Sequence, residues 1–287
     1  MDWTVVLAGA AVGFLVGLTG AGGGALMTPM LIFVFGVSPS AAISSDLVAA
    51  MVMRPVGGAV HLRRGTVNLP MVGWLTLGSV PAAFAGAYLL HLMGTGTAAE
   101  TRVEIVLGAA LLLGAGGMVL RAALGRRPGG GVAVRPVPTV AVGAVGGLLV
   151  GLTSVGSGSL MIVLLLLLYP TLAASQLVGT DLVQAVPLTA AAALGQLLFG
   201  HVVLAVTASL VVGSVPGVFA GSLLSSRAPD RLLRPVITFA LFASGLKYVG
   251  LGTAALACTL AGTLVVAGAA WAVVRWRRAG RLPAEAG

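Results

Sequence analysis

Charged side chains are scarce in this sequence. Only 8% of its 287 residues are Asp, Glu, Lys or Arg, whereas 58% are hydrophobic and the mean hydropathy is +1.10. A soluble domain carries roughly 25% charged residues, so this chain lacks the polar side chains that cover a globular surface. Alternating segments of about ten residues, which a membrane β-barrel needs, are also absent. The composition therefore predicts an all-α, polytopic membrane protein.

Residues that build metal and enzyme sites are equally rare. The one cysteine, Cys258, lies in an apolar segment, where we expect a small buried residue without a disulfide partner. The three histidines are scattered, and neither HExxH nor CxxC occurs. The glycine-rich stretches lack the strand–turn–helix context and the lysine of a nucleotide-binding loop. We therefore expect no enzyme activity, no metal, no cofactor and no use of ATP.

The net charge of +9 does not indicate a nucleic-acid partner, because the chain has no basic patch or binding motif. Its basic residues fall between apolar segments, where they set membrane topology. The first residues lack the basic region of a secretory signal, so we interpret the first apolar segment as a retained span.

Two glycine-rich breaks interrupt the apolar segments. The first break reads GLTGAGGGALMTP from Gly17 to Pro29, and the second reads GLTSVGSGSLMIV from Gly151 to Val163. Within a membrane, irregular backbone is tolerated only where protein or a water-filled cavity satisfies its polar groups. Paired breaks at corresponding places in two halves are typical of a transporter's binding site.

A membrane span needs about 20 apolar residues, which predicts about ten or eleven helices here. The short segments beside each break either span fully or are partly re-entrant. The expected segments are 4–19, 24–36, 40–61, 69–92, 101–121, 138–154, 158–169, 174–199, 202–224, 229–250 and 253–274.

The chain is predicted to contain two repeats, 1–124 and 138–252, joined by a basic linker at 125–137 and followed by an extra helix and tail at 253–287. Several landmarks recur at a spacing of 135 positions: Asp46 and Asp181, Gly65 and Gly200, Gly78 and Gly213, Pro81 and Pro216. The breaks recur at 134, which implies one inserted residue between break and aspartate.

Lysine and arginine concentrate in cytoplasmic loops, which predicts an outside N-terminus and a cytoplasmic C-terminus. The basic loops are Arg63–Arg64, the linker with Arg126, Arg127 and Arg135, the segment Arg227–Arg234, and the tail with Arg275, Arg277 and Arg278. An odd number of crossings separates matching points, so the repeats would be inverted, as in many transporters of the bacterial inner membrane.

Several motifs are similar to the sulfite exporter TauE/SafE family, also called TSUP. In the first half they are GLTGAGGGALMTP, SSDL and HLRRGTVN; in the second they are GLTSVGSGSLM, VGTDLVQAVP and GQLLFGHV. The resemblance covers nearly the whole chain except the final helix and tail. It implies a permease that moves small anions, typically sulfite, thiosulfate or organosulfonates.

The breaks supply candidate anion ligands, because a broken helix exposes backbone N–H groups and a helix N-terminus carries partial positive charge. Alternatively, the glycines serve only close helix packing. The candidates are Thr19, Gly20, Gly22, Gly23, Gly24, Thr153, Ser154, Gly156, Ser157, Gly158 and Ser159.

Asp46 and Asp181 are the acidic candidates, since a charge within a membrane is costly and therefore functional by default. Each would carry a proton, coordinate a cation, or hold a break by accepting its N–H groups. The alternative is an exposed cap near the start of a helix. Because a carboxylate repels an anion, we expect a coupling or scaffolding role.

Four further polar residues lie within predicted spans. Arg54 would bind an oxyanion, pair with Asp46 or extend to the membrane interface. Gln184 would bind substrate or the next helix. His61 and Gln196 share one repeat position and would act in coupling or scaffolding, or as interfacial polar caps.

The sequence thus predicts a secondary transporter for a small anion, working by alternating access between the breaks, with protons or another ion as the candidate coupling partner. A passive anion channel of the same fold, and a transporter of another small carboxylate or organic anion, are the alternatives. The lipid bilayer is the expected environment, and the oligomeric state stays open.

Overall fold

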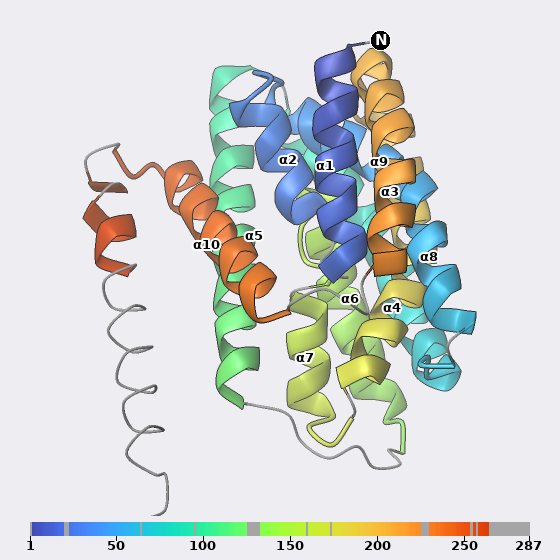
Figure 1. Cartoon of the computed structure of the whole chain (residues 1–287). Helices are drawn as coiled ribbons and strands as arrows, with labels where there is room; N and C mark the ends of the chain where they lie inside the picture. Colours follow the sequence, from blue (N-terminus) through green and yellow to red (C-terminus); the bar gives the residue numbers. More distant parts are fainter. Residues whose placement is uncertain are drawn as a thin grey trace, which may run out of the picture.

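The computed structural model describes residues 2–19, 23–63, 65–94, 96–124, 133–158, 160–172, 174–224, 230–252, 255–256 and 258–263. Over these residues the chain is helical and forms no strand (Figure 1). The main helices are α1 (Trp3–Thr19), α2 (Gly24–Phe33), α3 (Pro39–Arg63), α4 (Leu69–Leu92), α5 (Thr97–Leu124), α6 (Pro136–Thr153), α7 (Leu160–Leu168), α8 (Ala174–Phe199), α9 (Leu204–Leu224) and α10 (Asp230–Tyr248).

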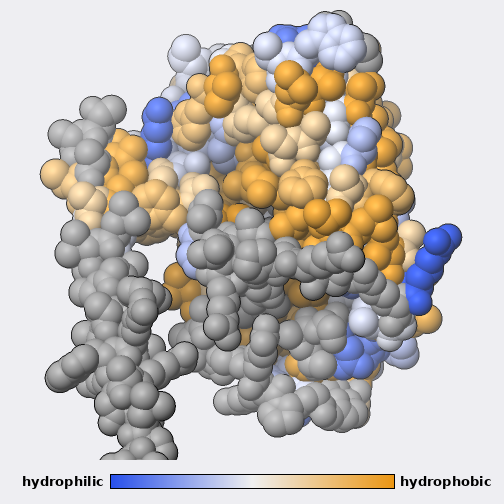
Figure 2. All heavy atoms as spheres, viewed as in Figure 1, coloured by the Kyte–Doolittle hydropathy of each residue, from blue (hydrophilic) through white to orange (hydrophobic). Residues whose placement is uncertain are grey.

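Six of these helices are long and apolar enough to cross a membrane: α3, α4, α5, α6, α8 and α9. On the face seen in Figure 2, hydrophobic side chains form a broad band across the middle, and hydrophilic residues lie mainly towards the two ends. The prediction of an all-α polytopic membrane protein is confirmed. The location of the termini relative to the membrane stays a prediction.

The helices beside the second break form a hairpin that turns back inside the molecule. The Tyr169 hydroxyl, just after α7, accepts from the backbone N–H of Arg135 at 2.8 Å and lies 2.5 Å from Thr139 Oγ1, in the first turn of α6. The start of α6 and the end of α7 therefore lie at the same end of the molecule. With only 9 residues, α7 rises about 14 Å, roughly half the thickness of a bilayer core.

The helices beside the first break form a second hairpin, which enters from the opposite end (Figure 1). The backbone N–H of Asp2 donates to Ser209 near the start of α9 at 3.1 Å. The neighbouring Val203 N–H donates to Ser45, in the second turn of α3, at 3.2 Å. Since α2 has 10 residues and ends shortly before α3 begins, α1 and α2 share one outer end. Each short pair is thus a hairpin that returns to its own end of the molecule.

Glycines allow each hairpin to pack closely against the other half of the chain. A Cβ atom on Gly13 of α1 would lie 2.6 Å from the Ser214 carbonyl oxygen of α9, and a Cβ on Gly147 of α6 would overlap the Ser79 carbonyl of α4. These contacts stand at matching repeat positions. Gly17 likewise packs against α9. This reciprocal pairing of α1 with α9 and of α6 with α4 fits a duplicated unit, which itself stays a prediction.

Some predicted segments lie outside the described residues. They include residues 125–132 of the linker, Arg64, the loop at 225–229 and all residues after 263. Of the extra helix predicted at 253–274, residues 255–256 and 258–263 are described as helical. Cys258 belongs to this piece and is exposed rather than buried, so the expectation for it was wrong.

Candidate transport site

The two breaks meet in the interior of the molecule. Gly24, the first residue of α2, lies so close to Ser154 that a Cβ atom on it would overlap the Ser154 carbonyl oxygen. Ser154 ends α6 with a left-handed backbone, at φ 60°. The two short helices are therefore positioned by backbone contact between the breaks, and only glycine fits at position 24.

Asp46 joins the two breaks by hydrogen bonds. Its side chain is fully buried in α3. Oδ2 accepts from the hydroxyl of Thr28 in α2 at 2.8 Å and from the hydroxyl of Ser154 at 2.7 Å. Oδ1 has no hydrogen-bond partner among the described residues. Asp46 is therefore not the exposed helix cap considered as the alternative.

Asp181 occupies the matching position in α8 and contacts the second break. It is also fully buried, and its Oδ2 accepts from the backbone N–H of Gly158 at 2.7 Å. Gly158 has a φ of 86°, a conformation that favours glycine. The carboxylate thus satisfies one of the backbone donors that the interruption of the helix exposes.

Arg54 lies between these two carboxylates. Its side chain is 6% exposed, so the guanidinium does not extend to a membrane interface. One terminal nitrogen donates to the hydroxyl of Ser157 in the second break, and the charge interacts electrostatically with Asp181 and Asp46. The other terminal nitrogen has no partner in the part of the chain that the structure describes. Arg54 therefore retains hydrogen-bonding capacity in a buried position.

The remaining candidates have local or interhelical partners. Thr153 bonds the Leu149 carbonyl of its own helix at 2.7 Å. Gln184 donates to Ser79 of α4 at 2.6 Å, which is the helix-to-helix contact considered for it. His61 lies 3.2 Å from Thr66 through Nδ1.

Gln196 is buried and donates to the Gly151 carbonyl at 3.3 Å. Gly156, at φ 131°, forms part of the turn of the second break.

Four predicted ligands lie wholly or partly outside the described residues. Thr19 is the last residue of α1, but its side chain lies outside the described residues, as do Gly20, Gly22 and Ser159 entirely. Among the described residues no group of three or more His, Cys, Asp or Glu is arranged to hold a metal ion.

Three hydroxyl residues at the site were not among the predicted ones: Thr28, Ser44 and Ser79. Thr28 belongs to the first break, four residues after Gly24, so helical spacing offered a signal. Ser79 lies in the GSVP motif that recurs at 213–216, which pointed to a repeat rather than to a contact. Ser44 opens the SSDL motif, but its partner Gln196 is remote in sequence, so the motif did not point to this contact.

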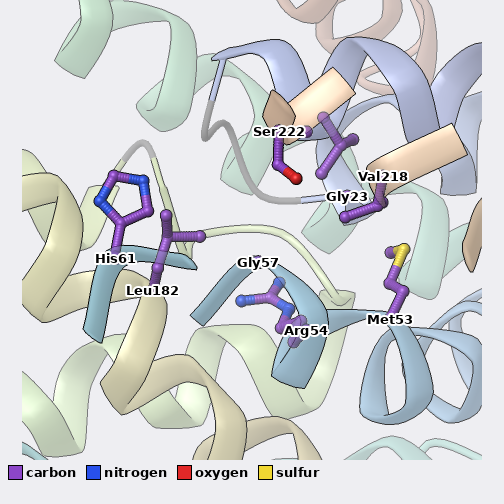
Figure 3. Close-up of a pocket in the computed structure, with 10 residues that line it drawn as sticks. Gly23, Met53, Arg54, Gly57, His61, Leu182, Val218 and Ser222 are labelled. Atoms are coloured by element: carbon purple, nitrogen blue, oxygen red, sulfur yellow. The ribbon is translucent and has the colours of Figure 1, made fainter. Parts of the chain in front are cut away.

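A pocket lies beside Arg54 and is lined by residues of both halves (Figure 3). Arg54, Gly57 and His61 lie along one face of α3, with Leu182 of α8 near the His61 end and Met53 towards the other. The remaining lining residues are Val16, Gly17, Gly23, Val218 and Ser222. A small molecule in this pocket would thus reach the buried guanidinium beside the breaks.

Comparison with known proteins agrees with this architecture. The family model "Sulfite exporter TauE/SafE" matches residues 5–248. The chain belongs to this family. The probable membrane transporter protein YjnA of Bacillus subtilis (strain 168) is 39% identical over 262 residues, which cover 87% of this chain and 100% of YjnA. The probable membrane transporter protein YunE of the same organism is 33% identical over 104 residues, 36% of each chain. No solved structure matches.

Membership of the TauE/SafE family, together with six apolar helices, makes this chain a multi-pass membrane transporter with a small-molecule substrate. The resemblance seen in the sequence motifs is confirmed.

Proposed function

We propose that this permease is a secondary transporter of a small anion, such as sulfite, thiosulfate or an organosulfonate, and that the anion binds beside the two breaks. The observation that carries the proposal is the buried Arg54, which lines the pocket and has one terminal nitrogen without a partner among the described residues. A guanidinium presents paired donors that match two oxygens of an oxyanion.

The surroundings of Arg54 suit a small anion. Ser157 accepts from the guanidinium and keeps it beside the second break. Gly23, which caps α2, lines the same pocket, so a ligand can approach the first turn of that helix. A helix N-terminus favours negative charge. The breaks therefore supply both a charged side chain and backbone polarity to one place.

The carboxylates of Asp46 and Asp181 are the groups that could couple anion transport to a proton or another cation. With Asp46 and Asp181 ionised, the three charged groups sum to one negative charge, and an arriving anion would make the buried cluster more negative. Buried like charges repel strongly at low dielectric. Anion binding is therefore favoured when a carboxylate takes up a proton or when a cation binds with the anion. We propose proton coupling through Asp46 or Asp181 on this ground.

A passive channel is the second candidate, because the same residues would line a pore. Uphill accumulation separates the two functions, since a channel carries an anion only down its electrochemical gradient. The purified protein in liposomes is assayed for uptake of sulfite, thiosulfate, sulfoacetate and an unrelated small carboxylate, with and without a pH gradient at zero membrane potential. Uptake above the equilibrium level that depends on the pH gradient supports the transporter.

Replacing Arg54 tests the site itself. Because hydrogen bonds to a charged group contribute about 1.5–3 kcal/mol, Arg54→Gln is expected to lower transport of the accepted anion about tenfold to a hundredfold. Arg54→Lys keeps the charge but loses the fork, so we expect a smaller loss. Equal flux in wild type and Arg54→Gln, at equal protein content in the liposomes, would contradict the site.

A further inference from the structure

His61 and Gln196 stand at the same repeat position, 135 residues apart, but their surroundings differ. Gln196 is fully buried near the end of α8; its Nε2 donates to the Gly151 carbonyl at 3.3 Å, and its Oε1 accepts from Ser44 at 2.8 Å. His61, near the end of α3, is partly exposed and lines the pocket beside Arg54. Gln196 is thus packed inside the molecule, whereas His61 lies at a pocket.

The same asymmetry extends to the residues around them. In the pocket, Gly17, Gly57, His61 and Leu182 are all partly exposed. Gly57 and His61 lie in the last two turns of α3, towards the end that carries Arg63 and is predicted to be cytoplasmic.

The counterparts of these four residues are closed off. Gly151, Ala192, Gln196 and Leu47 occupy the matching repeat positions, and all four are buried. They lie near the opposite end of the molecule, where α3 begins and α8 ends. The positions that match the pocket lining are therefore closed off from solvent, and Gln196 is held there by its hydrogen bonds.

We propose that Gln196 and His61 are the two gates of this transporter and that they close in alternation. In the state described here, Gln196 closes the outer side by bonding to Gly151. In the opposite state His61 closes the inner side on Gly17, the residue that matches Gly151 and already lines the same pocket as His61.

The chemistry of the gates follows from helix ends. Gly17 and Gly151 lie in the last turns of α1 and α6, where a backbone carbonyl has no N–H donor within its own helix. Glutamine and histidine both carry side-chain N–H donors that reach such a carbonyl, whether or not the imidazole is protonated. In one state the carbonyl accepts a hydrogen bond from the gate side chain, and in the other it faces a water-filled opening. Neither state therefore leaves the carbonyl buried without a partner.

This inference rests on the alternating access proposed above and on the predicted duplication, but not on the identity of the anion. It therefore admits a test without substrate. In a Cys258→Ser background, cysteine is introduced singly at Leu182, in the pocket, and at Leu47, its closed counterpart. Each protein is reacted in oriented vesicles with a membrane-impermeant maleimide applied to one face at a time.

Opposite shifts are expected for the two gates. Gln196→Ala removes the outer closure, so labelling at position 47 rises and labelling at position 182 falls. Loss of a buried hydrogen bond changes the equilibrium constant between the two states about fivefold to tenfold. The ratio of the two labelling rates should therefore shift by about the same factor. His61→Ala should shift the ratio by a similar factor in the other direction.

Matched controls distinguish gating from general loosening. Leu194→Ala and Leu62→Ala alter exposed residues on the same helices and should leave the ratio unchanged. The exchanges Gln196→His and His61→Gln keep a donor at each gate and should restore a ratio close to wild type. Ser44→Ala, which deletes one partner of Gln196, should act in the same direction as Gln196→Ala and covers the case in which that variant does not fold.

The outcomes separate this proposal from the proposed function. Shifts in the same direction for both alanine variants, or no shift in either, overturn the gates. Opposite shifts in a protein that transports none of the tested anions support the gates and contradict the substrate assignment.

Discussion

The two breaks share an arrangement of helices and differ in the side chains that they contribute. In both, a helix ends inside the molecule and a short helix leads back out. The second break carries Ser154 and Ser157, which bond to Asp46 and Arg54, whereas the first carries Gly20 and Gly23 at the matching positions. The order of the helices is thus common to the two breaks. Asp46 accepts hydrogen bonds from both breaks, through Thr28 and Ser154, whereas the hydroxyl that accepts from Arg54 belongs to the second break.

The largest loss of transport is expected from substitutions at the contact between the two breaks. Leucine at Gly24 would collide with the backbone of Ser154, and leucine at Gly158 would have to adopt a φ of 86°. Because backbone rather than a flexible side chain must move, each change should cost about 3 kcal/mol or more at the site, and we expect transport to be lost while the protein still inserts.

Gly116→Leu is the matched control, since nothing lies within 4 Å of a Cβ atom there. Flux in liposomes and membrane content are measured together. Normal flux in Gly24→Leu would mean that contact between the breaks is not needed for transport.

A moderate and equal loss of stability is expected from substitutions at the two glycine interfaces, between α4 and α6 and between α1 and α9. A Cβ atom on Gly78 would overlap the Val140 carbonyl of α6, and one on Gly213 would overlap the Val6 carbonyl of α1. Gly78→Leu and Gly213→Leu should each lower stability by about 1–3 kcal/mol, seen as similar decreases of Tm in detergent.

Gly73→Leu, at an open position of α4, should leave Tm near the wild-type value. If only one of the two interfaces is sensitive, the halves do not pack equivalently.

The smallest effect is expected at the mouth of the second hairpin. Tyr169 bonds there through its hydroxyl, whereas the matching residue of the first half is Phe35. Tyr169→Phe makes the halves alike at this position and should lower the free energy of unfolding by about 1 kcal/mol through the lost hydrogen bond.

Transport should be retained. Tyr88→Phe, at a side chain that is 44% exposed, serves as the control and should leave the unfolding midpoint in denaturant unchanged. A loss of transport in Tyr169→Phe with unchanged stability would assign the hydroxyl a role in the transport cycle instead.

Much of the fold follows from local features of the chain. Long apolar segments form helices because a membrane leaves no other way to satisfy the backbone, and the glycines of the two breaks predict where those helices end. The candidate residues Arg54, Asp46 and Asp181 could be found because charge within an apolar segment is costly. The structure places all three together in the interior.

Other features required the packed chain. From sequence alone, 4–36 and 138–169 could span fully or be partly re-entrant, because helix length near the limit does not decide how deep a segment reaches. The hydrogen bonds of Tyr169 and Asp2 to other elements show which end of the molecule each hairpin starts from. Thr28 and Ser44 were not predicted as site residues because the role of a hydroxyl depends on its hydrogen-bond partner, and the fold supplies that partner.

Local composition and spacing account for the helices, for the breaks and for the predicted correspondence between the two halves. The packed chain is needed to show that Asp46 bonds to Ser154 and Arg54 to Ser157, partners that lie 108 and 103 residues away. It also shows that the residues lining the pocket beside His61 are partly exposed while the residues at the matching positions beside Gln196 are buried. Burial depends on which segments pack against a residue, and residues that match in sequence can have different neighbours.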